Sequence, residues 1–194
     1  MRKLLTLTLM LLISTASLFS QTLDKIKIEK KSSEYSFSLG KEKYKAYFSV
    51  TDESRRPKIR FSGKTNFTYD SGFQDAKLDF EIFSNPKLNF SYLVINNYLD
   101  VTMGAEVYLI NKDYQFIFLG HLPIGAYNCI GDQKMNYNSI LSYLSIFYTK
   151  EKTYFSFEVP LVVINPGQTT EQIVESKKIH YTLTDNKLKQ NLTE

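Results

Sequence analysis

Apolar and polar side chains alternate at every second position along much of this chain, and this pattern restricts the fold more than any other feature. Aromatic and aliphatic residues alternate with serines from Tyr35 to Leu39 and with polar residues from Tyr44 to Val50. Successive side chains of a β-strand point to opposite faces, so the alternation places the rings on one face of a sheet. The turn at Gly40–Glu42 joins the two segments into a predicted hairpin.

Alternating or apolar segments recur in the middle of the chain at 59–69, 76–82, 88–95 and 101–120. The first and last of these contain a central turn and predict two more hairpins, the last one turned at Asn111–Asp113 and closed by Gly120. Segment 76–82 has one charged and one apolar face. The nearly unbroken apolar run 88–95 predicts a strand that is buried on both faces.

The last third of the chain is less regular. Segment 138–148 fits helical and strand spacing, and its aromatic content favours a strand. Thr169 and Gln172 form a capping-box pattern, which predicts one short helix over 169–177. Proline cannot donate to a strand ladder, so the apolar run 154–164 predicts an edge or bulged strand at Pro160. A strand over 179–183 is expected to end the fold.

Together these segments predict an all-β fold with at most one short helix. About ten short strands joined by Gly, Asn and Asp turns are typical of a sandwich or a barrel. We favour an antiparallel β-sandwich, with a β-barrel as the alternative.

The first 20 residues have the organisation of a secretory signal peptide. Arg2 and Lys3 precede an apolar run from Leu4 to Ile13, and small residues follow as far as Ser20. This run is about half of the roughly 20 apolar residues that a membrane span requires. The segment resembles the signal peptides of Gram-negative envelope proteins, and the resemblance is confined to it. We expect cleavage after Ser20, which leaves residues 21–194 as a single β-rich domain that is periplasmic or secreted.

The remainder of the chain contains one cysteine and no further long apolar run. Cys129 is the only cysteine, which excludes an intramolecular disulfide, and its apolar neighbours predict that it is buried. No apolar run after residue 21 approaches the length of a membrane-spanning helix, so we expect none.

Charge is unevenly distributed along the chain. Residues 24–64 include 12 basic and 6 acidic side chains, whereas residues 65–194 include 10 basic and 14 acidic ones. A positive region attracts anionic surfaces. Nucleic acid is not an expected partner of an exported protein whose residues 21–194 carry a formal net charge of only +2. An acidic glycan, lipid headgroups or an acidic protein fit better.

Groups that could support catalysis are sparse. His121 and His180 are the only histidines and belong to no metal-binding motif. The Gly-x-Ser-x-Gly motif and the glycine-rich nucleotide loops are absent. We therefore expect no metal and no cofactor, and a binding protein rather than an enzyme. Asp79 and Glu81, two residues apart on a predicted strand, are the one carboxylate pair with a spacing suited to glycoside hydrolysis.

The candidate ligand-binding residues are basic side chains, tyrosines and one histidine, namely Arg55, Arg56, Lys58, Arg60, Tyr98, Tyr114, His121 and Tyr127. Lys58 and Arg60 share one face of a predicted strand, and Arg55 and Arg56 lie in the adjoining turn. The tyrosines fall in or beside predicted turns, where a ring and a hydroxyl can meet a sugar or a protein. His121 is expected in a loop.

Three hypotheses of function follow from these features. The first is a non-catalytic binding or interaction module of the cell envelope, whose ligand is an anionic glycan or a protein. The second is a carrier that encloses a small apolar ligand in a β-barrel cavity. The third is a hydrolase that uses carboxylates near Asp79 and Glu81 or the loop at His121.

Overall fold

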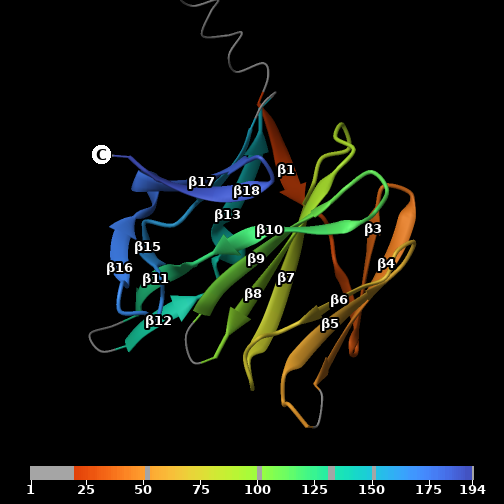
Figure 1. The fold of residues 1–194 in the computed structure, drawn as a ribbon, viewed down its shortest axis with the longest axis horizontal. Coiled ribbons are helices and arrows are strands. Elements are labelled where there is room, and N and C mark those ends of the chain that lie inside the picture. The colour runs from red at the N-terminus through yellow and green to blue at the C-terminus, as the bar shows by residue number, and fades with distance from the viewer. Residues whose placement is uncertain (1–19, 51–52, 100–101, 131–133, 150–151, 194) are drawn as a thin grey trace, which may run out of the picture.

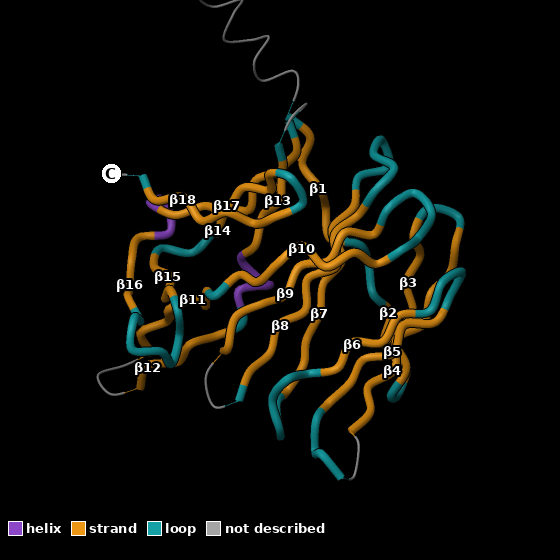
Figure 2. Tube along the Cα trace, in the orientation of Figure 1, coloured by secondary structure: helices purple, strands orange, loops and turns teal. Residues whose placement is uncertain are grey.

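The computed structural model describes residues 20–50, 53–99, 102–130, 134–149 and 152–193, and Figure 1 shows their arrangement. The predicted signal peptide, residues 1–20, lies outside the described residues except for its last position. All strand pairs in the described residues are antiparallel. The described residues contain no α-helix, only 3-10 turns at Ile140–Tyr143 and Ser176–Lys178, drawn purple in Figure 2. The predicted all-β class is confirmed.

The largest sheet has nine strands and nearly closes on itself. Its spatial order is β10 (Phe116–Leu122), β9 (Thr102–Ile110), β8 (Ser91–Tyr98), β7 (Lys77–Ser84), β1 (Gln21–Lys25), β13 (Leu144–Tyr148), β14 (Thr153–Phe157), β17 (Ile179–Thr184) and β18 (Lys187–Leu192). Its two end strands approach each other, because a Cβ atom placed on Gly120 of β10 would stand 3.5 Å from Leu188 of β18.

Two smaller sheets flank it, a five-stranded one at the right and a four-stranded one at the left of Figure 1. The five-stranded sheet contains, in order, β2 (Glu29–Lys31), β3 (Glu34–Leu39), β4 (Glu42–Val50), β5 (Pro57–Ser62) and β6 (Phe67–Asp70). The four-stranded sheet contains β12 (Lys134–Asn138), β11 (Ile124–Ile130), β15 (Leu161–Ile164) and β16 (Gln172–Glu175).

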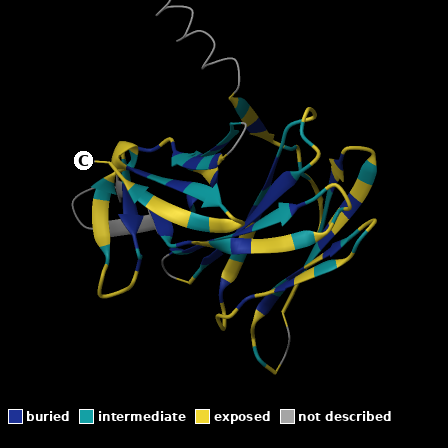
Figure 3. Cartoon of the chain, turned by 45° about the horizontal axis from the view of Figure 1, so that its top comes forward, coloured by how far each residue is buried: buried dark blue, intermediate teal, exposed yellow. Residues whose placement is uncertain are grey.

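Two hydrophobic cores lie on opposite faces of β7, β8 and β9. One face of β8 contributes Tyr92 and Val94 to a core shared with β11, β14 and β17. The other face contributes Leu93 and Ile95 to a core shared with the five-stranded sheet. Every residue of β8 from Ser91 to Asn97 is buried, which confirms the predicted doubly buried strand. The buried residues form the dark interior of Figure 3.

The architecture combines both predicted forms. The five-stranded sheet packs face to face on β7–β9, as in a sandwich, through aromatic contacts such as that of Phe61 with Phe80, whose ring centroids are 5.2 Å apart. The nine-stranded sheet curls around the other core, as a barrel does. The hairpins predicted at 35–50, 59–69 and 101–120 are present as β3–β4, β5–β6 and β9–β10.

Three sequence predictions in the last third are wrong. The strand expected over 179–183 does not end the fold, because β17 is followed by β18. The helix expected over 169–177 is strand β16, because the β-branched residues Ile173 and Val174 pair with Val163 and Val162 of β15. The run 154–164 is not one bulged strand. It divides at Pro160 into β14 and β15, which belong to different sheets.

Candidate functional site

The outward side chains of the five-stranded sheet form a basic, hydroxyl-rich surface, here called the basic face. Its basic and hydroxyl-bearing residues are Ser36, Ser38, Lys43, Lys45, Tyr47, Ser49, Lys58, Arg60 and Ser62, and the carboxylates of Glu29, Glu34 and Asp70 lie on the same side of the sheet. Strand register places these residues side by side: Lys45 lies between Ser36 and Ser62, and Tyr47 lies opposite Arg60. Because the intervening residues face the aromatic core, the side chains left on this face are mostly polar. Lys43 to Ser49 extend for about 20 Å along β4.

Glu34 of β3 holds the centre of this face in place. Its carboxylate accepts hydrogen bonds from Lys45 Nζ at 3.1 Å and from Tyr47 Oη at 3.0 Å. The hydrogen bond from Lys45, followed by that from Tyr47, lowers the pKa of Glu34. The same hydrogen bond raises the pKa of Lys45, so both groups are ionised at neutral pH. Tyr47 is thereby oriented beside Arg60.

Two hollows lie along β4 on this side of the sheet. One, of about 520 Å³, is lined by Tyr47, Ser49, Arg60 and Ser62. Its neighbour, of about 490 Å³, is lined by Ser36, Ser38, Lys43 and Lys45, and also by Lys27 and the carboxylate-bearing Glu29. Hydroxyl donors and acceptors and cationic donors therefore line both hollows.

The four predicted basic residues differ in their contacts. Arg55 Nη2 lies 2.8 Å from Asp75 Oδ1, and Lys58 Nζ lies 2.7 Å from Asp70 Oδ2. Arg56 is exposed in the β4–β5 turn. Arg60 forms no ion pair with any described residue, nor does Lys43. The cations of the basic face that are best placed to meet an anion are therefore Arg60 and Lys43, and Lys43 was not among the predicted site residues.

The other predicted site residues are dispersed over the molecule. Tyr98 ends β8, and Tyr114 lies in the β9–β10 turn with its ring stacked on Tyr44 at 6.3 Å. Tyr127 lies within β11 of the four-stranded sheet, so its predicted turn position is wrong. The structure does not bring these three tyrosines to the basic face.

His121 was expected in a loop, but it lies in strand β10. A bulge at Leu119 precedes Gly120, which pairs with Val107 instead of ending the hairpin, and β10 continues to Leu122 with His121 opposite Glu106 of β9. The His121 ring packs over Gly104, where an added Cβ would stand 2.9 Å from Nε2. The contact removes water from one side of an otherwise exposed ring and lowers the pKa of His121, an effect that the charge of Glu106 opposes.

A buried polar cluster joins β6 to β8 and β9. Tyr69 Oη donates to Glu106 Oε1 at 2.8 Å, and Tyr108 Oη donates to Glu106 Oε2 at 2.8 Å. Asn97 Nδ2 donates to Tyr69 Oη at 2.5 Å and accepts through Oδ1 from Ser71 Oγ at 2.9 Å. Burial raises the pKa of both tyrosines. This cluster was not predicted from the sequence, because its members come from segments that are distant along the chain.

The carboxylates of Asp79 and Glu81 line one hollow of about 260 Å³ together with Ile28, Lys30, Tyr35 and Phe80. Partial burial raises the pKa of both carboxyl groups, while Lys25, with its Nζ 3.9 Å from Glu81 Oε1, opposes the shift. This hollow and the two on the basic face open to solvent. None of the three is the enclosed cavity that the carrier hypothesis requires.

Within the described residues, no three His, Cys, Asp or Glu side chains gather as a metal site. No helix in the same part of the chain is long and apolar enough to cross a membrane. The side chain of Cys129, expected to be buried, lies outside the described part. The chain matches no protein-family model, no curated protein and no solved structure.

Proposed function

We propose that the chain is an exported, non-catalytic binding module of the cell envelope whose basic face binds an anionic, hydroxyl-rich ligand, with an acidic glycan as the leading class. The observation that carries the proposal is the position of Arg60, a cation that forms no ion pair with a described residue, in a hollow with Tyr47, Ser49 and Ser62. Export is supported by the pattern of residues 1–20.

The chemistry of the face supports this ligand class over the others. A guanidinium can hold a carboxylate with two parallel hydrogen bonds, and serine hydroxyls can donate to and accept from sugar hydroxyls. The two adjacent hollows suit a chain-like ligand that runs along β4 rather than a single compact molecule. Lipid headgroups and acidic proteins share the anionic group but lack this density of hydroxyls.

The test is binding of alginate, an acidic polysaccharide, compared with the neutral polysaccharide dextran, by isothermal titration calorimetry. We expect binding of alginate that weakens as salt is added, because exposed charges are screened. The double variant Lys43→Ser with Arg60→Ser should bind about tenfold more weakly, from a loss of about 0.7 kcal/mol per charge.

The matched control is Lys177→Ser with Lys178→Ser, which removes the same charge from the turn between β16 and β17. This control should bind alginate as the unaltered protein does. No binding of alginate at low salt, or equal weakening of binding in both double variants, would show that the basic face is not the binding site.

A carboxylate-dependent hydrolase is the second candidate, favoured by the shared hollow and the raised pKa of Asp79 and Glu81. A glycosidase needs one carboxyl group that stays protonated near neutral pH to act as the general acid. This candidate predicts release of reducing ends from a polysaccharide panel, reduced at least about 100-fold in Asp79→Asn and in Glu81→Gln. Asp185→Asn, in the exposed β17–β18 turn, is the control. Absence of release, or full activity in both variants, excludes this site.

A further inference from the structure

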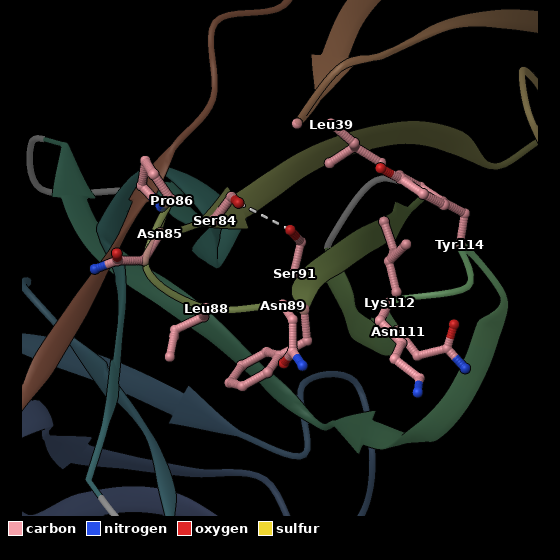
Figure 4. A pocket seen from close by; sticks show the side chains of 13 residues that line it. Leu39, Ser84, Asn85, Pro86, Leu88, Asn89, Ser91, Asn111, Lys112 and Tyr114 are labelled. Atoms are coloured by element: carbon pink, nitrogen blue, oxygen red, sulfur yellow. Dashed lines mark hydrogen bonds between the residues drawn. The ribbon is translucent and has the colours of Figure 1, made fainter.

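A further hollow, here called the turn pocket, lies between three hairpin turns at one end of the β7–β9 strands. The β3–β4 turn contributes Leu39 and Gly40, the β7–β8 turn contributes residues 84–86 and 88–91, and the β9–β10 turn contributes residues 110–112 and Tyr114. Figure 4 shows Ser84 and Ser91 near the centre of this view, with Tyr114 and Lys112 at one side and Leu88 at the other. The pocket measures about 290 Å³ and is separate from the basic face.

Two asparagines of the pocket are already used in shaping its walls. Asn85 donates to Thr22 O at 2.8 Å and accepts from Lys87 N at 2.9 Å. Asn111 Oδ1 accepts from the backbone of Asp113 and Gln115, both at 2.9 Å. These bonds fix the turns before any ligand arrives. A preorganised site loses less entropy on binding.

Besides the amide of Asn89, which can both donate and accept, the polar groups left over can act as hydrogen-bond donors. Ser91 Oγ donates to Ser84 Oγ at 2.9 Å, which leaves the hydroxyl hydrogen of Ser84 free to donate outward. The Lys112 ammonium forms no ion pair with a described residue. Tyr114 Oη lies 3.5 Å from the position of a Cβ on Gly40, so the absent side chain keeps that hydroxyl accessible.

Tyr114 is held firmly in this position. Its backbone has a φ of +61°, its ring stacks on Tyr44, and Lys64 Nζ lies 4.9 Å above the ring centroid. The carbonyl of Tyr114 also accepts a hydrogen bond from the Thr65 hydroxyl. The ring therefore forms a fixed wall of the pocket rather than a loose lid.

The rest of the wall is apolar, and none of the 13 lining residues is acidic. The apolar side chains are Leu39, Pro86, Leu88, Phe90 and Ile110. We propose that the turn pocket binds small molecules that carry one carboxylate on an apolar body, with the carboxylate toward Lys112 and Ser84. An acceptor-rich anionic group satisfies the free donors, and the apolar body covers the remaining wall.

The experiment follows backbone amides of the isotope-labelled protein by ¹H–¹⁵N NMR during titration with hexanoate and, separately, with its neutral counterpart hexanamide. We expect saturable shifts of the amides of Ser84, Ser91 and Lys112 with hexanoate, in about the millimolar range. Lys112→Gln should weaken hexanoate binding by about two- to fivefold, the range for one exposed ion pair, and should leave hexanamide binding unchanged.

Lys87→Gln is the matched control, because Lys87 is exposed in the β7–β8 turn but does not line the pocket. It should bind hexanoate as the unaltered protein does, and the spectra themselves report whether each variant is folded. The proposal is overturned if the pocket amides show no saturable shift at the highest soluble concentration, if hexanamide binds as tightly as hexanoate, or if both lysine variants weaken hexanoate equally. None of these outcomes bears on alginate binding at the basic face.

Discussion

The hydroxyl of Tyr69 joins two sheets through hydrogen bonds that almost no water can replace. The residue is 3 % exposed, and its oxygen donates to Glu106 and accepts from Asn97. Tyr69→Phe keeps the ring in the core but leaves a half-buried carboxylate oxygen of Glu106 and the buried amide of Asn97 without one partner each. We expect the free energy of unfolding, measured by urea denaturation, to fall by about 1–3 kcal/mol.

Tyr154→Phe is the control for this prediction. Its ring stacks on Phe147 at 4.9 Å, and its hydroxyl bonds no described residue, so the free energy of unfolding should change by less than about 0.5 kcal/mol. A loss in Tyr69→Phe no larger than in Tyr154→Phe would mean that the buried cluster adds nothing to stability.

Individual site residues could be predicted only where strand alternation decides them. The shared face of Lys58 and Arg60 follows from their spacing of two, and the same parity places Lys43, Lys45 and Tyr47 beside them. The pairing of Arg55 with Asp75 could not be predicted, because the two residues are 20 positions apart and meet only after β5 and β6 fold. Of the four basic residues predicted as ligand-binding from the sequence, Arg55 and Lys58 are therefore already paired with carboxylates in the structure.

At the scale of elements, the hairpins β3–β4, β5–β6 and β9–β10 were predicted correctly, whereas the β17–β18 hairpin and the connections between sheets were not. β3–β4 and β5–β6 depend on local alternation and turn residues alone. Strand β18 was missed because only Leu188 and Leu192 are apolar in it, although Asp185 and Asn186, both with positive φ, form the kind of turn that joins hairpins. The structural role of these leucines is visible only in the fold, where Leu188 lies beside Gly120 of β10 and both leucines pair with residues of β17.

Strand β1 illustrates a second physical limit on sequence analysis. It lies between β7 and β13, which are distant in the chain, and pairs through Asp24 and Lys25 on one side and Gln21–Leu23 on the other. Only Leu23 is buried among its five residues, so its sequence has little amphipathic pattern. A short strand of this kind forms because the edges of two neighbouring strands offer it hydrogen-bond partners. The periodicity of its own five residues carries no information about those partners.

At the scale of the whole molecule, β7, β8 and β9 separate two cores and belong to both. Leu93 and Val94 are adjacent in β8, fully buried, and point into different cores. A substitution that disrupts packing in one core must therefore also disturb strands that form a wall of the other core. We expect the described part of the chain to unfold in one cooperative transition, in agreement with the predicted single domain.

Hydrogen exchange of Leu93→Ala tests this coupling. The substitution opens a cavity in the core under the five-stranded sheet and should cost about 2–5 kcal/mol. If the cores are coupled, amides that exchange through global unfolding should lose the same protection in β5, beside that cavity, and in β14, in the other core. Val50→Ala is the control. The Val50 side chain is 62 % exposed, so this substitution should leave the protection of amides in both β5 and β14 unchanged. A loss confined to β3–β6 would show instead that the five-stranded sheet unfolds independently and that the chain contains two cooperative units.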